Sequence, residues 1–142
     1  MKVTKTYKNI ILKLKNIYIK TLKNKIRSTI IITAENQERF IERCLVSCLN
    51  QSIKNIEIII IYTKLKNIKF LQKKYLLKNI IFLNVPKKIN NPTQDQLFKI
   101  KQGFLISKGK YIFLLDGDDT YKKKKVKKVM NSIKNKKILF LD

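Results

Sequence analysis

The sequence contains no histidine and no tryptophan, and only two cysteines, two prolines and three glycines. The absence of histidine excludes a catalytic triad built on histidine, a histidine general base and a zinc site with histidine ligands. No Gly-rich dinucleotide-binding loop or P-loop is present, so a dinucleotide oxidoreductase or an NTPase fits poorly. Cys44 and Cys48 are four residues apart, which is a helix-face spacing and not that of a CxxC metal or redox motif. Two free thiols fit a reducing, cytoplasmic setting.

Acidic residues are also scarce. Nine Asp and Glu face 33 Lys and Arg in 142 residues, and the formal net charge is +24. Such a charge attracts polyanions, which include nucleic acid, anionic lipid and phosphorylated small molecules. The abundance of Lys, Ile and Asn is equally typical of an AT-rich coding sequence, so both explanations of the charge stay open.

Long apolar runs are missing as well. No segment reaches the roughly 18 to 20 consecutive apolar residues of a membrane span, and we expect no secretory signal because lysines interrupt every apolar run near the N-terminus. Residues 1–27 hold nine basic residues and no acidic one, with apolar residues at helical spacing. This pattern predicts a basic amphipathic helix. It either lies on an anionic membrane surface, which would place the protein on the inner face of the cytoplasmic membrane, or packs as an ordinary surface helix.

From residue 28 onward, short β-branched runs alternate with segments of helical periodicity. Strands are expected at residues 29–33, 57–62, 80–85, 111–115 and 138–141. This order is typical of an α/β domain over residues 28–142, with a mostly parallel sheet and helices on both faces. In such sheets, ligands bind at the carboxyl ends of the strands.

Local signals set the expected helix ends. Asn36 can cap a helix whose first turn holds Glu38. Thr93 has capping-box spacing to Gln96, before a helix that runs to residue 107. Gly109 stands where a C-terminal helix glycine belongs. Further helices are expected over residues 69–77 and after residue 120.

The last of these helices is rich in lysine, with a run of lysines at residues 122–128. In the favoured interpretation these lysines face solvent, with Val126, Val129 and Ile133 on the buried side. Binding of phosphate or membrane by the lysines stays as the alternative.

An acidic loop follows the strand expected at residues 111–115. It reads Asp116-Gly117-Asp118-Asp119. Three neighbouring carboxylates repel one another, and a divalent cation is a common reason to collect them. Gly117 would let a phosphate-bearing ligand approach closely. A solvated turn is the simpler alternative, since Asp and Gly are common turn residues.

Two other known loops resemble this one. An EF-hand is excluded because its glycine and glutamate positions hold Tyr121 and Lys127. The phosphotransferase motif of the haloacid dehalogenase superfamily resembles the run Asp116, Asp118, Thr120. That family's nucleophile strand normally comes first in the domain, and its later motifs have no room after the loop here. A phosphotransferase fragment is therefore kept as an alternative only.

Two separated blocks resemble family 2 glycosyltransferases. Residues 29–61 read TIIITAENQERFIERCLVSCLNQSIKNIEIIII, similar to the family's first strand, its loop with Asn, its helix ending in Leu-Asn-Gln and its second strand. Residues 103–119 read GFLISKGKYIFLLDGDD, similar to its Asp-x-Asp region. The resemblance covers residues 28–142 and implies a Rossmann-like GT-A fold and a glycosyltransferase that uses a nucleotide-diphospho-sugar donor and a glycan or lipid-linked acceptor of the cell envelope or surface.

The resemblance also implies roles for particular residues. Asp118 would coordinate Mg²⁺ or Mn²⁺ that bridges the diphosphate, and Asp116 would contact the ribose or the metal shell. The remaining expected nucleotide-sugar contacts are in the loop after the first strand and in the helix before the acidic loop: Thr33, Glu35 and Asn36, and either Lys99 or Lys101.

The sequence departs from the family pattern at three places. Family members usually carry acids after the second strand that contact the nucleotide base, and this sequence has Tyr62-Thr63-Lys64-Leu65 there. Ile100-Lys101 stands where they often have Arg-Asn. The family's acceptor-binding region and catalytic base lie beyond Asp142, so no residue is assigned as the base.

A non-catalytic basic protein that binds membrane or nucleic acid is the competing class. The charge fits it, and Tyr7, Tyr18 and Phe104 could stack on bases. No zinc finger, RNP-like strand or helix-turn-helix pair is recognised, which disfavours nucleic acid.

Overall fold

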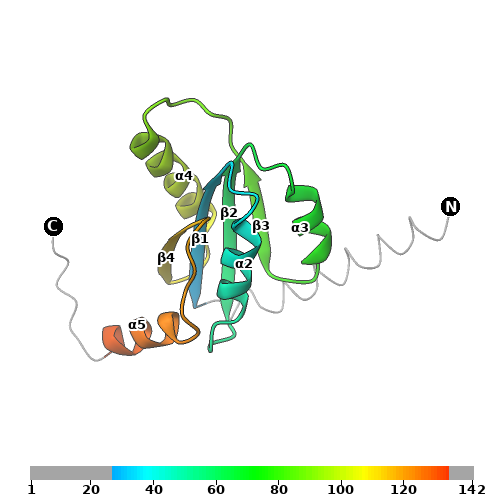
Figure 1. Ribbon diagram of the computed structural model, residues 1–142. Coiled ribbons are helices and arrows are strands. Elements are labelled where there is room, and N and C mark those ends of the chain that lie inside the picture. Colours follow the sequence, from blue (N-terminus) through cyan, green and yellow to red (C-terminus); the bar gives the residue numbers. More distant parts are fainter. Residues whose placement is uncertain (1–26, 135–142) are drawn as a thin grey trace.

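The computed structural model of the protein describes residues 27–134, which form a parallel sheet with helices on both sides (Figure 1). The four strands are β1 (Ser28–Glu35), β2 (Ile56–Thr63), β3 (Ile80–Asn84) and β4 (Tyr111–Asp116). Their order in the sheet is β3-β2-β1-β4, and every pairing is parallel. Four of the five expected strands are thus confirmed. The strand expected at 138–141 and the helix expected over residues 1–26 lie outside the described residues.

The central strands are buried because their residues are apolar and β-branched on both faces. Ile30, Ile31 and Ile32 of β1 are fully buried, and so are Ile59, Ile60 and Ile61 of β2. A continuous run of this kind is what a parallel strand covered on both faces requires. At about 25 cal/mol per Å² of apolar area, burial of such side chains supplies the main driving force for this fold.

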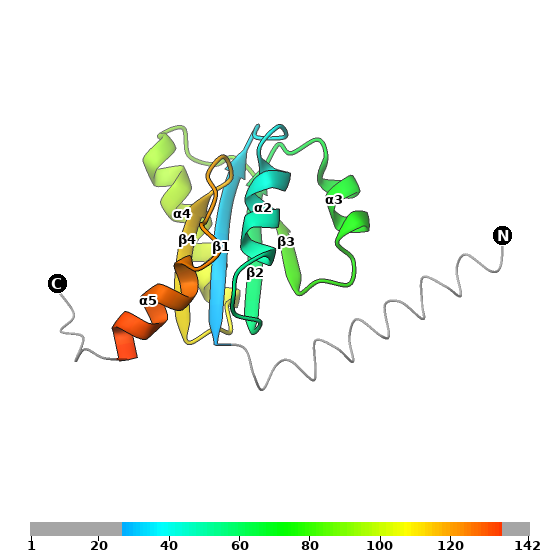
Figure 2. The ribbon, with the colours of Figure 1, turned by 60° about the horizontal axis from the view of Figure 1, so that its bottom comes forward.

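Helices cover both faces of the sheet, as Figures 1 and 2 show. One face packs against α2 (Ile41–Leu49), α3 (Ile68–Lys74) and α5 (Lys125–Lys134), which bury Cys44, Leu71 and Val126 in the larger core. The other face packs against α4 (Pro92–Ile106), whose Phe98 joins the smaller core around Ile31 and Ile59. The expected α/β architecture is confirmed.

The expected start of the first helix is wrong. Asn36 does not cap it, because Asn36 has a φ of 51° and forms a turn; Asn tolerates this left-handed conformation better than most residues. The helix begins only at Ile41. Glu38 lies before it, and its Oε1 accepts a hydrogen bond of 3.1 Å from the backbone N–H of Lys66. It therefore ties the loop after β1 to the loop after β2.

The expected cap of α4 is also wrong. The cap is Asn91, whose side chain accepts from the backbone N–H of Gln94, and Pro92 is the first helical residue. Asn is a strong N-cap, and Pro suits the first helical position because no intrahelical partner awaits its missing N–H. Thr93 therefore lies inside the helix.

Gly109 does not end α4, which finishes at Ile106. It instead lies against β1: a Cβ atom on Gly109 would be 2.4 Å from the backbone nitrogen of Thr29. A side chain is excluded there by close approach of two chain segments, not by a left-handed helix end.

The lysine-rich segment becomes α5, with its lysines exposed and Val126 and Met130 buried. Val129 and Ile133 are half-buried, so the helix has the exposed lysine face and the buried side that the sequence predicts. Binding of phosphate or membrane by these lysines stays an alternative. In the described part of the chain, no helix is long and apolar enough to cross a membrane.

Candidate functional site

A cleft lies at the carboxyl ends of β1 and β4, beside the first turns of α4. It has a volume of about 250 Å³. Since β2 lies on one side of β1 and β4 on the other, the strand order changes direction between β1 and β4. Open α/β sheets bind their ligands at such a switch point. We call this feature the acidic cleft, because four carboxylates line it: Glu35, Asp95, Asp116 and Asp118.

Asp116 is the last residue of β4, and its carboxylate is held from two sides. Its Oδ1 accepts a hydrogen bond of 3.3 Å from the hydroxyl of Thr33, its register partner on β1. The side-chain amide of Gln96, on α4, donates to the same oxygen. One carboxylate oxygen is thereby fixed, and the group has a defined orientation in the cleft.

The carboxylates after Asp116 diverge. Asp118 lines the acidic cleft, and its backbone carbonyl accepts a hydrogen bond of 3.0 Å from the guanidinium of Arg43. Asp119 lines a different hollow beside Leu114 and Tyr121. Asp118 and Asp119 therefore line two neighbouring hollows, and Asp116 lines both.

Gly117 fills a structural role between them. A Cβ atom at Gly117 would lie 2.5 Å from the side-chain oxygen of Gln37 and 2.9 Å from Cβ of Ala34. The chain itself occupies the space that the sequence analysis assigned to a ligand, so that expectation is corrected.

The opposite wall of the cleft is a cluster of two acids and two lysines. The ammonium group of Lys99 lies 2.5 Å from Oδ2 of Asp95 and 3.4 Å from Oε2 of Glu35. The ammonium group of Lys87 lies 2.8 Å from Oε2 of Glu35. Asp95 and Lys99 are 2% and 3% exposed, which is rare for charged residues unless they are paired.

These ion pairs shift the pKa values of Glu35 and Lys87. The hydrogen bond from Lys87, with the charge of Lys99 acting in the same direction, holds the pKa of Glu35 below its ordinary value of 4.5. In return, the hydrogen bond to Glu35 raises the pKa of Lys87. Deeper in the wall, Oδ1 of Asp95 is buried and has no hydrogen-bond partner.

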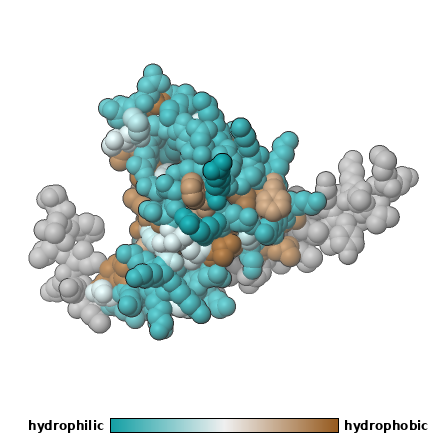
Figure 3. Space-filling model, viewed as in Figure 1, coloured by the Kyte–Doolittle hydropathy of each residue, from teal (hydrophilic) through white to brown (hydrophobic). Residues whose placement is uncertain are grey.

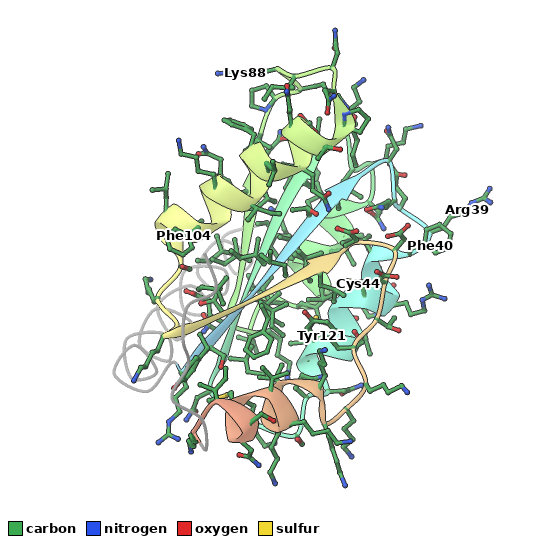
Figure 4. The ribbon with its side chains drawn as sticks, turned by 90° about the vertical axis from the view of Figure 1, so that its left-hand side faces the viewer. Arg39, Phe40, Cys44, Lys88, Phe104 and Tyr121 are labelled. Carbon is green, nitrogen blue, oxygen red and sulfur yellow. The ribbon has the colours of Figure 1, made fainter. Side chains whose placement is uncertain are left out.

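Near the acidic loop, the side chains of Cys44 and Tyr121 have raised pKa values and stay protonated at neutral pH. The neighbouring Cys48 thiol and burial raise the pKa of Cys44, which keeps it protonated. Burial raises the pKa of Tyr121 to about 12, and its hydroxyl donates to the carbonyl of Leu114. Figure 4 labels Cys44 on α2 and Tyr121 in the segment that connects β4 to α5. They support the loop, and neither is among the residues that line the acidic cleft.

Seven residues were named for the site in the sequence analysis, with Lys99 and Lys101 as alternatives to each other, and five of them line the acidic cleft: Thr33, Glu35, Lys99, Asp116 and Asp118. Asn36 and Lys101 are exposed and do not line it. Of the two alternative lysines on α4, Lys99 lines the cleft and Lys101 does not. A role for Asn36 or Lys101 in nucleotide-sugar binding stays a prediction.

Sequence reasoning missed several lining residues, above all Asp95 and Gln96. Their spacing to Lys99 was a usable signal, because residues three or four positions apart share one helix face. Lys87 carries no such signal. It comes from the loop after β3 and reaches Glu35 only because the sheet order brings these loops together.

The donor set suits a metal that is shared with a ligand. Among residues 27–134, no three Asp, Glu or Cys side chains gather to hold a metal ion. Mg²⁺, however, is usually bound by one or two carboxylates together with substrate phosphates and water. Asp118 and the free oxygen of Asp116 meet that requirement, whereas a site that holds its metal by protein ligands alone does not fit.

Comparisons with known proteins agree with this fold. The sequence model described as "Glycosyl transferase family 2" matches residues 29–141. Crystal structures of S. aureus TarS resemble the fold, with a TM-score of 0.63 for TarS 1-349 in complex with UDP-GlcNAc and 0.61 for its complex with UDP. The sequence identity is 18% in both cases, so this likeness concerns the fold alone. No curated protein matches the chain.

The likeness covers most of this chain and a smaller part of its neighbours. It includes 77% of this chain, but 31% and 32% of the two TarS 1-349 structures and 20% of the longer TarS structure. The chain therefore spans about a fifth to a third of the solved chains that it resembles.

Proposed function

Because the chain belongs to glycosyl transferase family 2, we propose that the acidic cleft binds a nucleotide-diphospho-sugar whose sugar is transferred to a glycan or lipid-linked acceptor of the cell envelope or surface. One observation carries this proposal: Asp116 and Asp118 face a cleft at the switch point of the sheet. The TarS structures contain UDP and UDP-GlcNAc, so UDP-linked sugars are the first donors to test.

The charge of the cleft argues for a metal ion. Four carboxylates and the ammonium group of Lys99 line it, and Lys87 pairs with Glu35, so these six groups carry a net charge of −2. The phosphates of a donor are anionic too, and like charges at short distance repel strongly when water is partly excluded. A divalent cation would offset this repulsion. When bound, Mg²⁺ or Mn²⁺ would also stabilise the negative charge on the departing diphosphate.

The residues of the cleft then have distinct tasks. Asp118, whose carboxylate accepts no hydrogen bond from the described protein groups, would be the principal metal ligand. Asp116 is oriented by Thr33 and Gln96, which leaves its second oxygen for the metal shell or a ribose hydroxyl. Lys99 stays paired with Asp95 and Glu35, so it would shape the wall more than it neutralises the diphosphate.

Two neighbouring carboxylates supply a matched test. Asp118→Asn and Asp119→Asn remove the same charge one residue apart, but only Asp118 lines the acidic cleft. Isothermal titration calorimetry with Mn²⁺ and a panel of UDP-, GDP- and CMP-linked sugars compares both variants with the wild type. Loss of a group that only hydrogen-bonds to a metal ligand already weakens metal binding by about 10- to 100-fold, so Asp118→Asn should lower the Mn²⁺-dependent affinity at least that much. Asp119→Asn should keep it.

Three results would count against the proposal. Equal Mn²⁺-dependent affinity of the wild type and the Asp118 variant would refute the metal assignment. Equal losses in both variants would show that only the overall charge matters. A wild type that binds none of the panel, with or without metal, would refute donor binding itself and favour the non-catalytic alternative.

A further inference from the structure

The four strands all begin at one edge of the sheet, which we call the amino edge. A cation stands one or two residues before the start of each strand: Arg27, Lys54, Lys78 and Lys110. Because all pairings are parallel, these residues, far apart in sequence, belong to one end of the molecule. In Figure 1 it is the lower end, where the blue strand β1 begins.

Carboxylates are placed at the opposite edge. Seven of the eight acidic residues of the described part lie at strand ends, in the loops after them or in first helical turns there: Glu35, Glu38, Glu42, Asp95, Asp116, Asp118 and Asp119. The eighth, Glu57, is 1% exposed. Its Oε2 accepts hydrogen bonds from Thr29 and from the backbone N–H of Lys108. The amino edge therefore presents cations with no exposed carboxylate of residues 27–134 among them.

A hollow at this edge concentrates the positive charge. It has a volume of about 180 Å³ and is lined by Arg27, Lys54, Lys127 and Lys134, with Ile53 and Met130 at its apolar side. The four cations come from the strand entry, the loop after α2 and two turns of α5. None of these four has an ion-pair partner among the described residues.

Large apolar side chains lie exposed at the same end. Leu77, in the loop that leads into β3, is 61% exposed. Phe104 and Leu105, in the last turn of α4, are 62% and 66% exposed. Figure 4 shows Phe104 pointing away from the sheet at the end of α4. Figure 3 shows apolar patches set within a largely hydrophilic surface. Exposed apolar patches rimmed by polar residues are common at protein and membrane interaction sites.

From these observations we propose that the amino edge is a docking face for anionic phospholipid membranes. Its cations would bind lipid phosphates, and Leu77, Phe104 and Leu105 would enter the headgroup boundary. Basic residues with exposed apolar side chains are the chemistry that such surfaces recognise. The basic and apolar sequence of residues 1–26 joins the chain at Arg27, on this same edge. The acidic cleft lies at the other ends of the strands, about 26 Å away for an eight-residue strand, and so faces soluble donors.

A membrane fits the whole face better than nucleic acid does. Nucleic-acid phosphates would pair with the lysines, but they offer nothing to Leu77 or Leu105. Proteins that bind nucleic acid strands without sequence preference pair a basic groove with aromatic side chains on which bases stack. Phe104 is the one aromatic residue among the three exposed side chains named above.

Two triple variants of the full chain supply the test. The amino-edge variant removes three charges from that edge, by Lys54→Gln, Lys78→Gln and Lys110→Gln. The control variant removes three exposed charges from the opposite half of the molecule, by Arg39→Gln, Lys69→Gln and Lys88→Gln. Figure 4 shows Arg39 and Lys88 in that half. Co-sedimentation with vesicles of phosphatidylglycerol and phosphatidylcholine, against pure phosphatidylcholine, measures binding. We expect the amino-edge variant to bind anionic vesicles at least about tenfold more weakly and the control variant to bind within about twofold of the wild type.

Four outcomes would overturn the proposal. Equal loss in both variants would show that only net charge matters, and no loss in either would assign vesicle binding to residues outside this face. Competition by inorganic phosphate at the same phosphate concentration would indicate a site for single ions. Wild-type binding to random DNA but not to anionic vesicles would favour a nucleic-acid surface.

A second variant tests the apolar part and does not depend on charge. Leu77→Ser with Leu105→Ser changes only exposed side chains, so the fold should be kept, which circular dichroism checks. Salt screens the cations but not apolar insertion. The vesicle binding that remains at high salt should therefore fall in this variant. Unchanged binding at high salt would contradict the insertion of these side chains.

Discussion

Asp95 and Lys99 form an ion pair of 2.5 Å within α4 while both side chains are almost completely buried, 3% and 4% exposed. Bringing two charges out of water costs several kcal/mol per ion, and their attraction offsets this only with good geometry. Here the geometry is helped by the i and i+4 spacing and by Glu35, which lies 3.4 Å from the same ammonium group. The pair fixes one wall of the acidic cleft and ties α4 to β1.

The first prediction concerns removal of one partner. Lys99→Met leaves the carboxylate of Asp95 buried, with Lys87 at 3.9 Å as its nearest cation. Breaking a buried pair in this way costs about 3 to 5 kcal/mol, so urea denaturation should show a loss near the lower end of that range. Replacing both residues, Asp95→Leu with Lys99→Met, should lower the free energy of unfolding less than the single change. A double variant as unstable as Lys99→Met would show that the pair itself stabilises the fold.

The second prediction concerns pH and the pair of Glu35 and Lys87. The pKa of Glu35 is lowered in the folded state and that of Lys87 is raised. The Glu35 contribution is therefore present above pH 4.5 and is lost as the pH falls through the folded pKa. The Lys87 contribution is present below pH 10.5 and is lost as the pH rises further.

Lys87→Gln isolates this effect. The stability difference between the wild type and this variant should be constant at neutral pH and should shrink at both extremes. Thermal unfolding followed from pH 3 to pH 11 measures it, with Lys88→Gln as the control, because Lys88 is exposed and adjacent. A difference that grows below pH 4.5 would have the wrong sign for a lowered Glu35 pKa.

The third prediction compares two glycines. A Cβ atom on Gly109 would lie 2.4 Å from the backbone nitrogen of Thr29 and 2.5 Å from the carbonyl carbon of Ser28, so β1 itself would have to move. A Cβ atom on Gly103 would meet only the side chain of Ile31, at 2.7 Å. Overpacking typically costs about 1 to 3 kcal/mol, whereas Ala in a helix gains about 1 kcal/mol over Gly.

Gly109→Ala should therefore destabilise the protein by more than Gly103→Ala, and its loss should reach or exceed about 3 kcal/mol. Chemical denaturation of both variants gives the comparison. If Gly103→Ala proved the more harmful change, the close approach of residue 109 to β1 would not be the constraint that we describe.

Most of the fold could be predicted from the sequence. The four described strands were predicted within two residues at each end, because strands buried on both faces need long runs of β-branched residues, and β1 and β2 are such runs. Helix starts were harder. Asn36 and Thr93 both have the chemistry of a cap, but a cap also needs the right backbone angles, and the competing turn at residue 36 and the Asn91-Pro92 pair decided otherwise.

The sequence by itself determined the elements and the acidic loop, because hydrophobic period and turn chemistry are local properties of the chain. Only the tertiary structure decided which charged groups share a space. Glu35 meets Lys99 across 64 residues, while Asp118 and Asp119, adjacent in sequence, face different hollows. Strand order and loop direction are set by packing of the whole sheet, so contacts of this kind have no local signal. The same order places seven carboxylates at one edge and four strand-entry cations at the other, which is a property of the fold and cannot be seen in the linear sequence.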